Sequence, residues 1–435
     1  MFGTMLHDLY KGSLQVLTLR VSWAIIGFIG QVIIARAVSI ETYGQYSLIL
    51  TWLAVLCLAG RLGFDESSVK FVARYNEKDQ ATRLHAFIHF ALMYVTITSV
   101  VLGMITGLVI LKLENNNPPL MEAWLIGLLC FPFLCLNSVR QGILRGMRQF
   151  ARSQLGDTTI RPLAVIILIL FMQFGLGMSI DLPILMWIST SAIVLAFFLG
   201  IYWLNTSLPD RPTRTSTKAE RTDWLKTSAW MALLSSSILV LNRTDILMLG
   251  AMRDAMEVGL YTAAVRIATL FTFGLSAVNT AVAPLLSRAH GRGDLEGLSQ
   301  LMRKGTLISV SVGLLLLLAT LLLGDYILIL FGSEYLQAKT TFFILVSAHL
   351  VSAIAGPTGT LMNMTGHHKT MAIILAVAGL INIVLNLILV PGYGTEGAAA
   401  ATLMSTFAWK LYTVLYVHRN LKIRPGIMAF LPDKP

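Results

Sequence analysis

The chain has 435 residues, of which 56% are hydrophobic and 13% are charged. Soluble domains carry about 25% charged residues and about 45–50% apolar ones, which excludes an ordinary soluble protein. The formal net charge of +11 does not indicate nucleic acid as a partner, because membrane proteins concentrate Lys and Arg in their cytoplasmic loops. We therefore expect an all-α integral membrane protein.

Twelve apolar segments are each long enough to cross the ~30 Å hydrocarbon core of a bilayer, which takes about 20 helical residues. We place them at 14–37, 44–63, 85–111, 121–143, 160–178, 183–204, 228–250, 259–283, 305–330, 340–362, 370–391 and 397–417. The residues before the first segment show no compact apolar run followed by a cleavage site, so we expect no removable signal peptide.

The loops between these segments differ sharply in charge. Twelve spans put both termini on one side, and the termini and loops of that side hold 22 of the 33 Lys and Arg residues. The opposite loops hold three, Lys112, Arg253 and Lys339. Because basic residues favour the cytoplasmic side, this distribution predicts that both termini are cytoplasmic.

The least hydrophobic stretch of the chain lies between the sixth and seventh segments. It predicts four regions: an N-terminal six-helix lobe at 1–204, a cytoplasmic linker at 205–227, a C-terminal six-helix lobe at 228–417 and a basic cytoplasmic tail at 418–435.

The two lobes show signs of an internal repeat. A shift of 215 residues aligns Tyr46 with Tyr261 and Gly44 with Gly259. An even number of spans per copy gives both copies the same orientation, so we expect a parallel repeat about an axis along the membrane normal. Two such lobes could expose a central cleft to either face in turn.

Several stretches resemble a known family. They are ETYGQYSL, LNRTDILMLG, VGLYTAAVRIATL, LMNMTGHHK and INIVLNLILVPGYGTEGAAAATLMS. Together they resemble the polysaccharide or lipid-linked oligosaccharide (O-antigen type) flippases of the multidrug/oligosaccharidyl-lipid/polysaccharide (MOP) exporter superfamily. The resemblance implies a flippase that moves a polyprenyl-pyrophosphate-linked oligosaccharide across the bacterial cytoplasmic (inner) membrane by alternating access. Its partners would be membrane lipids and proteins of glycan assembly, for example of lipopolysaccharide.

Six basic residues within or near the spans form a predicted cationic path for an anionic cargo: Arg20, Arg61, Arg140, Arg243, Arg266 and Lys410. Guanidinium groups hold phosphates through paired hydrogen bonds and stay charged when desolvated. By helix, the resemblance places Arg20, Arg61 and Arg266 where related lipid II flippases carry cavity arginines. The alternative is that Arg20, Arg61 and Arg140 extend to lipid headgroups.

Asp245 is the one carboxylate well inside a predicted span. It is a candidate for coupling transport to H⁺ or Na⁺, and the alternative is a structural ion pair. Arg243 is two residues away and faces another side of the helix, so we expect Arg266 as the ionic partner. Asn382 and Asn386 could contact sugar hydroxyls or form interhelical hydrogen bonds.

The sequence predicts no enzyme. It shows no catalytic constellation, no metal-binding spacing, no cofactor motif and no nucleotide-binding loop. Two alternatives stay open: an ion-coupled multidrug or organic-cation antiporter of the same superfamily, and a membrane glycan polymerase or ligase. The first would favour acidic cavity residues, and the second would need catalytic groups on a long outer loop.

Overall fold

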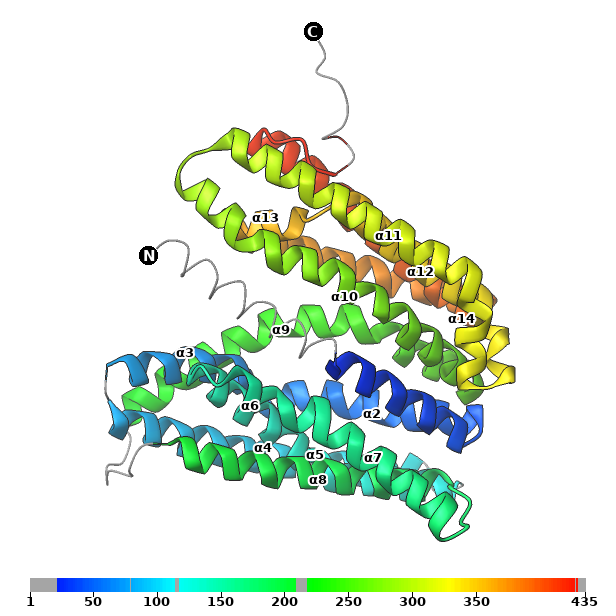
Figure 1. The fold of residues 1–435 in the computed structure, drawn as a ribbon. Coiled ribbons are helices and arrows are strands. Elements are labelled where there is room, and N and C mark those ends of the chain that lie inside the picture. Colours follow the sequence, from blue (N-terminus) through cyan, green and yellow to red (C-terminus); the bar gives the residue numbers. More distant parts are fainter. Residues whose placement is uncertain (1–21, 79, 114–116, 209–216, 427, 429–435) are drawn as a thin grey trace. The chain divides into compact units, whose positions relative to one another are not determined.

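The computed structural model describes residues 22–435 except for 79, 114–116, 209–216, 427 and 429–435 (Figure 1). All regular elements in that part are helical, without strands. Nine of its helices are long and apolar enough to cross a membrane, and a shorter apolar helix covers Ser22–Ala37. The expected all-α, multispan membrane class is confirmed, whereas the number of twelve spans and the location of the termini stay predictions.

The chain divides into two compact units, which we describe separately. The N-unit is Ile29–Leu239, and the C-unit is Val240–Pro435 together with the segment that ends at Phe28. Phe28 packs edge-on against Phe331, with 5.7 Å between the ring centres. The division differs from the predicted lobes because it falls inside the continuous helix α9, Lys218–Met252.

The N-unit is built around a central helix, α5. Its elements are α2 (Ile40–Arg61), α3 (Phe64–Glu77), α4 (Ala81–Leu113), α5 (Pro118–Gly146), α6 (Phe150–Leu155), α7 (Arg161–Leu170), α8 (Leu182–Ser207) and the first part of α9. Helix α5 packs against α2, α3, α4 and α8, and α4, α5 and α8 run alongside one another in Figure 1. A π-helical turn, Gly156–Ile160, joins α6 to α7 just before Pro162.

The C-unit is a bundle of long helices. After the end of α9 come α10 (Ala255–Gly291), α11 (Leu295–Phe331), the 3₁₀ segment η3 (Ser333–Ala338), α12 (Lys339–Ala355), α13 (Thr358–Met364) and α14 (His368–Leu421). The chain breaks between α12 and α13 at Gly356 and Pro357, where Gly356 has a φ of 67°. Within α14, Gly394 leaves the helical region with φ 52° and ψ −127°, which separates the predicted eleventh and twelfth spans.

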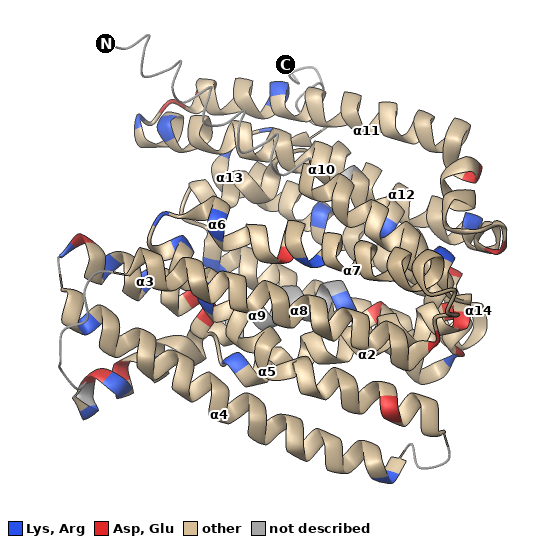
Figure 2. Ribbon diagram, turned by 60° about the horizontal axis from the view of Figure 1, so that its bottom comes forward, with Lys and Arg blue, Asp and Glu red and all other residues tan. Residues whose placement is uncertain are grey.

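Several helices begin at a short polar residue whose side chain accepts a hydrogen bond from a backbone N–H group of the first turn. Such caps are Ser39, Asn117, Asp181, Asp254 and Asp294. Between the ends, long stretches of α4 and α11 carry no charge, as Figure 2 shows. Exposed leucines such as Leu108 and Leu315 lie on these stretches. Uncharged, outward-facing apolar surface of this kind suits contact with lipid.

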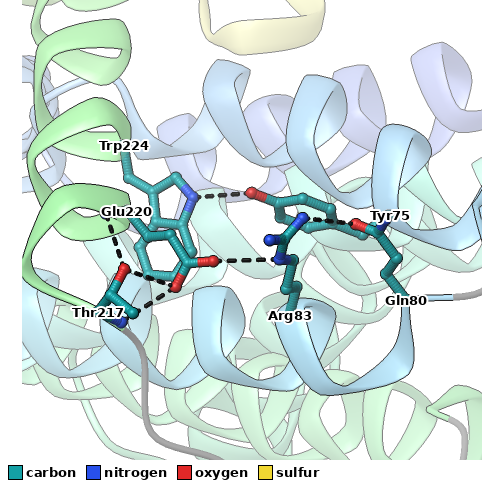
Figure 3. A network of polar contacts seen from close by, with 6 residues as sticks. All are labelled: Tyr75, Gln80, Arg83, Thr217, Glu220 and Trp224. Atoms are coloured by element: carbon teal, nitrogen blue, oxygen red, sulfur yellow. Dashed lines mark hydrogen bonds and ion pairs between the residues drawn. The ribbon is translucent and has the colours of Figure 1, made fainter.

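Helix α9 begins earlier than expected and belongs at first to the N-unit. Thr217 and Glu220 cap each other's backbone N–H groups, at 3.3 and 3.0 Å, as in a capping box. Trp224 is 1% exposed, and its indole N–H donates to the Tyr75 hydroxyl at 3.0 Å. Glu220 pairs with Arg83 at 3.1 Å (Figure 3). The second half of the predicted linker is therefore a docked helix.

Candidate functional site

A buried carboxylate joins three helices of the C-unit. Asp245, on α9, is 8% exposed. Its Oδ2 accepts hydrogen bonds from the Tyr261 hydroxyl of α10 at 2.7 Å and from the Thr402 hydroxyl of α14 at 2.5 Å. Its Oδ1 accepts one from the Asn386 amide of α14 at 2.8 Å. All three donors are neutral groups.

A second layer of amides supports this site. The Asn386 amide also donates to the backbone carbonyl of Asn382 at 2.9 Å and to its side-chain oxygen at 3.2 Å. Asn382 in turn donates to the Ser405 hydroxyl at 3.4 Å. The Oδ1 of Asn386 is buried and has no hydrogen-bond partner among the described residues. An acceptor oxygen therefore remains in the same pocket of polar groups as the carboxylate.

The expected ion pair of Asp245 with Arg266 is wrong. Tyr261 and Arg266 are five residues apart on α10 and therefore point to different sides of it, so Tyr261 is buried and Arg266 is exposed. Within the described part of the chain, Asp245 has no cationic partner. A buried charge without a counter-ion is costly, so this site favours uptake of a proton or a small cation.

Three basic groups of the C-unit have no carboxylate partner among the described residues. Arg243 is half-buried on α9, and Arg266 is exposed on α10. Lys410, half-buried on α14, places its Nζ 4.2 Å from the ring centre of Trp409. Over the residues that the structure covers, none of these three cations forms an ion pair. Basic groups without counter-ions favour an anionic ligand.

Arg61 lies in the N-unit and does have a partner. Its Nη1 is 3.1 Å from Oδ2 of Asp65, and the two side chains are 17% and 8% exposed. Burial raises the pKa of the Asp65 carboxyl, and the Arg61 charge opposes that rise. The sequence placed Asp65 just beyond the second span without assigning it a role.

Arg140 has surroundings that do not match a cavity-lining arginine. Its side chain is fully buried, and its Nε donates to the Asn137 side-chain oxygen at 2.8 Å. The Asn137 amide donates to Asp157 at 2.5 Å, and Gln141 donates to the same carboxylate. Arg140 and Asp157 thus share Asn137 inside the N-unit. We leave Arg140 out of the cargo path for this reason.

Arg20 falls outside the residues that the structure describes, and its role stays a prediction. The partners of Asp245 were only partly visible in the sequence. Asn382 and Asn386 are one helical turn apart, a spacing that puts both amides on one face, and the interhelical alternative holds for Asn386. Tyr261 and Thr402 gave no signal beyond their positions in the motif stretches.

Comparison with known proteins agrees with this architecture. The family model described as "Polysaccharide biosynthesis protein" matches residues 9–290, and the MatE model matches residues 231–388. The "Probable flippase AglR" of Haloferax volcanii is 25% identical over 298 residues, which cover 66% of this chain and 59% of that protein. The match therefore spans less than two thirds of this relative.

Two solved structures share the fold. A structure titled "Lipid II flippase MurJ, inward closed conformation" has a TM-score of 0.74 at 17% identity and covers 93% of this chain and 87% of the other. A multidrug resistance MATE family transporter of the MOP superfamily, in its inward-facing conformation, has a TM-score of 0.73 at 16% identity and covers 92% and 94%. At these identities the likeness establishes the fold alone.

The helices and their arrangement define a multispan membrane protein with the fold of MOP superfamily transporters. Because the family model matches more than half of its length, the chain belongs to the polysaccharide biosynthesis protein family. The resemblance seen in the sequence motifs is thereby confirmed.

Proposed function

We propose that this protein is a flippase, and not an enzyme, that moves a polyprenyl-pyrophosphate-linked oligosaccharide from the inner to the outer leaflet of the bacterial cytoplasmic membrane. It would do so by alternating access, with twelve spans in two six-helix lobes related by a parallel repeat and with both termini in the cytoplasm. The family match and the relative named as a probable flippase support this proposal.

The observation that carries the proposal is that Arg243, Arg266 and Lys410 have no carboxylate partner among the described residues of the C-unit. Cationic groups without a counter-ion can hold a pyrophosphate through charge-assisted hydrogen bonds. Asp245 does not form an ion pair with any of them in the described residues, and the donors to its two oxygens are neutral groups.

We further propose that Asp245 binds the ion that drives transport, either H⁺ or Na⁺. A carboxylate with only neutral donors gains a counter-charge when a proton or cation arrives. The uncompensated charge is the energetic reason for binding. The side-chain oxygens of Asn386 and Thr402 could join the carboxylate in holding a cation. The sites for cargo and ion would then lie on the same helices, α9 and α10.

A multidrug or organic-cation antiporter is the second candidate, because the fold is shared with a MATE transporter. A cationic drug would need an accessible carboxylate in the cargo site. The C-unit instead offers the cations Arg243, Arg266 and Lys410, and its carboxylate Asp245 is buried. The charge of the site therefore favours an anionic cargo.

Glycan export in cells that lack the native protein tests the proposal. Arg266→Ala or Arg243→Ala should reduce export about ten- to a hundred-fold at matched protein levels, since charge-assisted hydrogen bonds contribute roughly 1.5–3 kcal/mol each. The same loss is expected for Arg20→Ala and Arg61→Ala. Arg→Lys should restore export only in part, because Lys lacks the two-pronged geometry.

Lys339→Ala is the matched control. Lys339 belongs to the same unit but forms an exposed ion pair with Asp325 at 2.9 Å, so export should be unchanged. Full export in all of the Arg→Ala variants would show that the cargo does not depend on these cations and would overturn the proposal.

A further inference from the structure

The chain turns sharply where α2 ends and α3 begins. Arg61 is the last residue of α2, and the next two residues both adopt left-handed backbone conformations, with φ 44° at Leu62 and φ 75° at Gly63. This conformation is unfavourable for a residue with a side chain such as Leu62. The turn brings Asp65 of the next helix back onto the Arg61 guanidinium.

The first part of α9 holds this turn in place. A side chain at Gly63 would overlap the backbone carbonyl of Ser228 and the backbone nitrogen of Ala232. The hydroxyl groups of Ser67 and Ser228 are 2.6 Å apart, and both residues are fully buried. One turn before Ser228, Trp224 fixes α9 to the end of α3 (Figure 3). Packing of α9 against the turn and against α3 therefore fixes the position of Asp65.

The ion pair that results is incomplete. Arg61 and Asp65 share one contact, while Nε of Arg61 and Oδ1 of Asp65 are buried and have no hydrogen-bond partners within the described ranges. Complete buried ion pairs normally satisfy these remaining atoms, because desolvation is costly otherwise. Arg61 thus keeps donors that a second acceptor could use.

We propose that Asp65 is an internal counter-ion that occupies Arg61 between transport cycles and yields it to the pyrophosphate of the cargo. This inference rests on the proposed function. An unpaired Arg61 guanidinium group would be costly to desolvate at this position. The Asp65 carboxylate therefore stabilises the protein when no cargo is bound. An incoming pyrophosphate offers more acceptor oxygens than one carboxylate and can engage the free donors of Arg61. Asp65 would be a positioning residue that sets cargo affinity.

An exposed ion pair on the same helix gives the contrast. Glu77, at the end of α3, pairs with Arg148 at 2.9 Å, but the two side chains are 66% and 78% exposed. Water solvates both charges there, so loss of this pair should have little effect on binding of a cargo. Glu77 therefore serves as a control for the loss of one acidic residue from α3.

The test is binding of farnesyl pyrophosphate to the purified full-length protein in lipid nanodiscs, measured by calorimetry against farnesol, which lacks the pyrophosphate. Asp65→Asn should tighten binding about fivefold, because the competing carboxylate is removed. Asp65→Ser should act in the same direction, in case the first variant does not fold. Glu77→Gln should leave the Kd unchanged. Arg61→Ala should weaken binding and abolish the effect of Asp65→Asn.

The outcomes separate this inference from the proposed function. If the wild-type protein binds farnesyl pyrophosphate no better than farnesol, the proposed recognition of a pyrophosphate is wrong. The counter-ion role of Asp65 is then wrong as well. A wild type that binds the pyrophosphate, with folded Asp65 variants that bind equally or more weakly, would overturn the counter-ion alone. Tighter binding is the informative result, since a purely structural ion pair would not produce it when broken.

Discussion

Each unit of the molecule holds an acidic group among polar side chains, half-buried Asp157 in the N-unit and buried Asp245 in the C-unit, and the two are compensated differently. In the N-unit, Asp157 shares Asn137 with the buried cation Arg140. In the C-unit, Asp245 receives hydrogen bonds from neutral groups alone. The first centre contains charges of both signs, while the second keeps a net negative charge. We infer that the first serves stability and the second serves ion binding.

Two tyrosines sharpen this comparison. Tyr46 and Tyr261 align under the 215-residue shift, and both hydroxyl groups are hydrogen-bonded inside their units. Tyr46 contacts the neutral hydroxyl of Ser189 at 2.8 Å, whereas Tyr261 donates to the Asp245 carboxylate at 2.7 Å. The same residue type therefore supports packing in one unit and a charged site in the other.

The largest expected effect comes from removing the cation of the N-unit. Arg140→Met would remove the hydrogen bond of a fully buried guanidinium group to Asn137 and the cation near half-buried Asp157, and a hydrogen bond to a charged group contributes about 1.5–3 kcal/mol. We expect loss of folded protein or a strongly lowered Tm, measured by thermal unfolding in detergent. Adding Asp157→Asn should recover part of the loss. An Arg140→Met variant with unchanged Tm and impaired transport would instead assign Arg140 to the cargo path.

A smaller loss of stability is expected from Gly200→Ala. A Cβ at this position of α8 would overlap the guanidinium group of Arg140, and overpacking of this kind costs about 1–3 kcal/mol. The control is Gly107→Ala on α4, where the new Cβ would meet only Leu128 at an ordinary 3.6 Å. Equal Tm values for the two variants would contradict the tight packing around Arg140.

In the C-unit, Tyr261→Phe should impair transport more than folding. It removes one donor from the Asp245 carboxylate, and hydrogen bonds to charged groups contribute about 1.5–3 kcal/mol. We expect an export rate about tenfold lower at matched protein levels. Unchanged export would show that the hydrogen bond from the Tyr261 hydroxyl to Asp245 has no part in the transport cycle.

The smallest effect is expected from Tyr46→Phe, the matched change in the N-unit. The lost contact joins two neutral hydroxyl groups, so stability should fall by about 1 kcal/mol and export should stay at the wild-type level. Equal export defects in Tyr46→Phe and Tyr261→Phe would remove the distinction between the two units.

Sequence patterns predicted the helices well, because the length and hydropathy of a span are local properties. The segments around α5 and α8 are examples, and Gly394 interrupts α14 between the predicted spans 370–391 and 397–417. Helix α3 was missed and taken as part of a loop. It is short and half polar, and its apolar side is buried through packing on α4, α5 and the first part of α9.

The sequence predicted charged residues of the candidate site but not the residues with which they interact. Asp245 was singled out from its depth in a span, whereas its partners Asn386 and Thr402 lie 141 and 157 residues further along the chain. Trp224 and Tyr75, 149 residues apart, are a similar case. Such pairings depend on how helices pack, which local composition does not encode. For the same reason the sequence alone could not distinguish Arg140 from the other arginines of the predicted cationic path.

Transport in proteoliposomes tests the central claim most directly. The purified protein would be reconstituted with a labelled polyprenyl-pyrophosphate-linked oligosaccharide, and movement between leaflets would be followed with and without an H⁺ or Na⁺ gradient. The account predicts gradient-dependent translocation by the wild type and its loss in Asp245→Asn with an unchanged Tm. Equal translocation by the wild type and Asp245→Asn, or none by a folded wild type under either gradient, would contradict it.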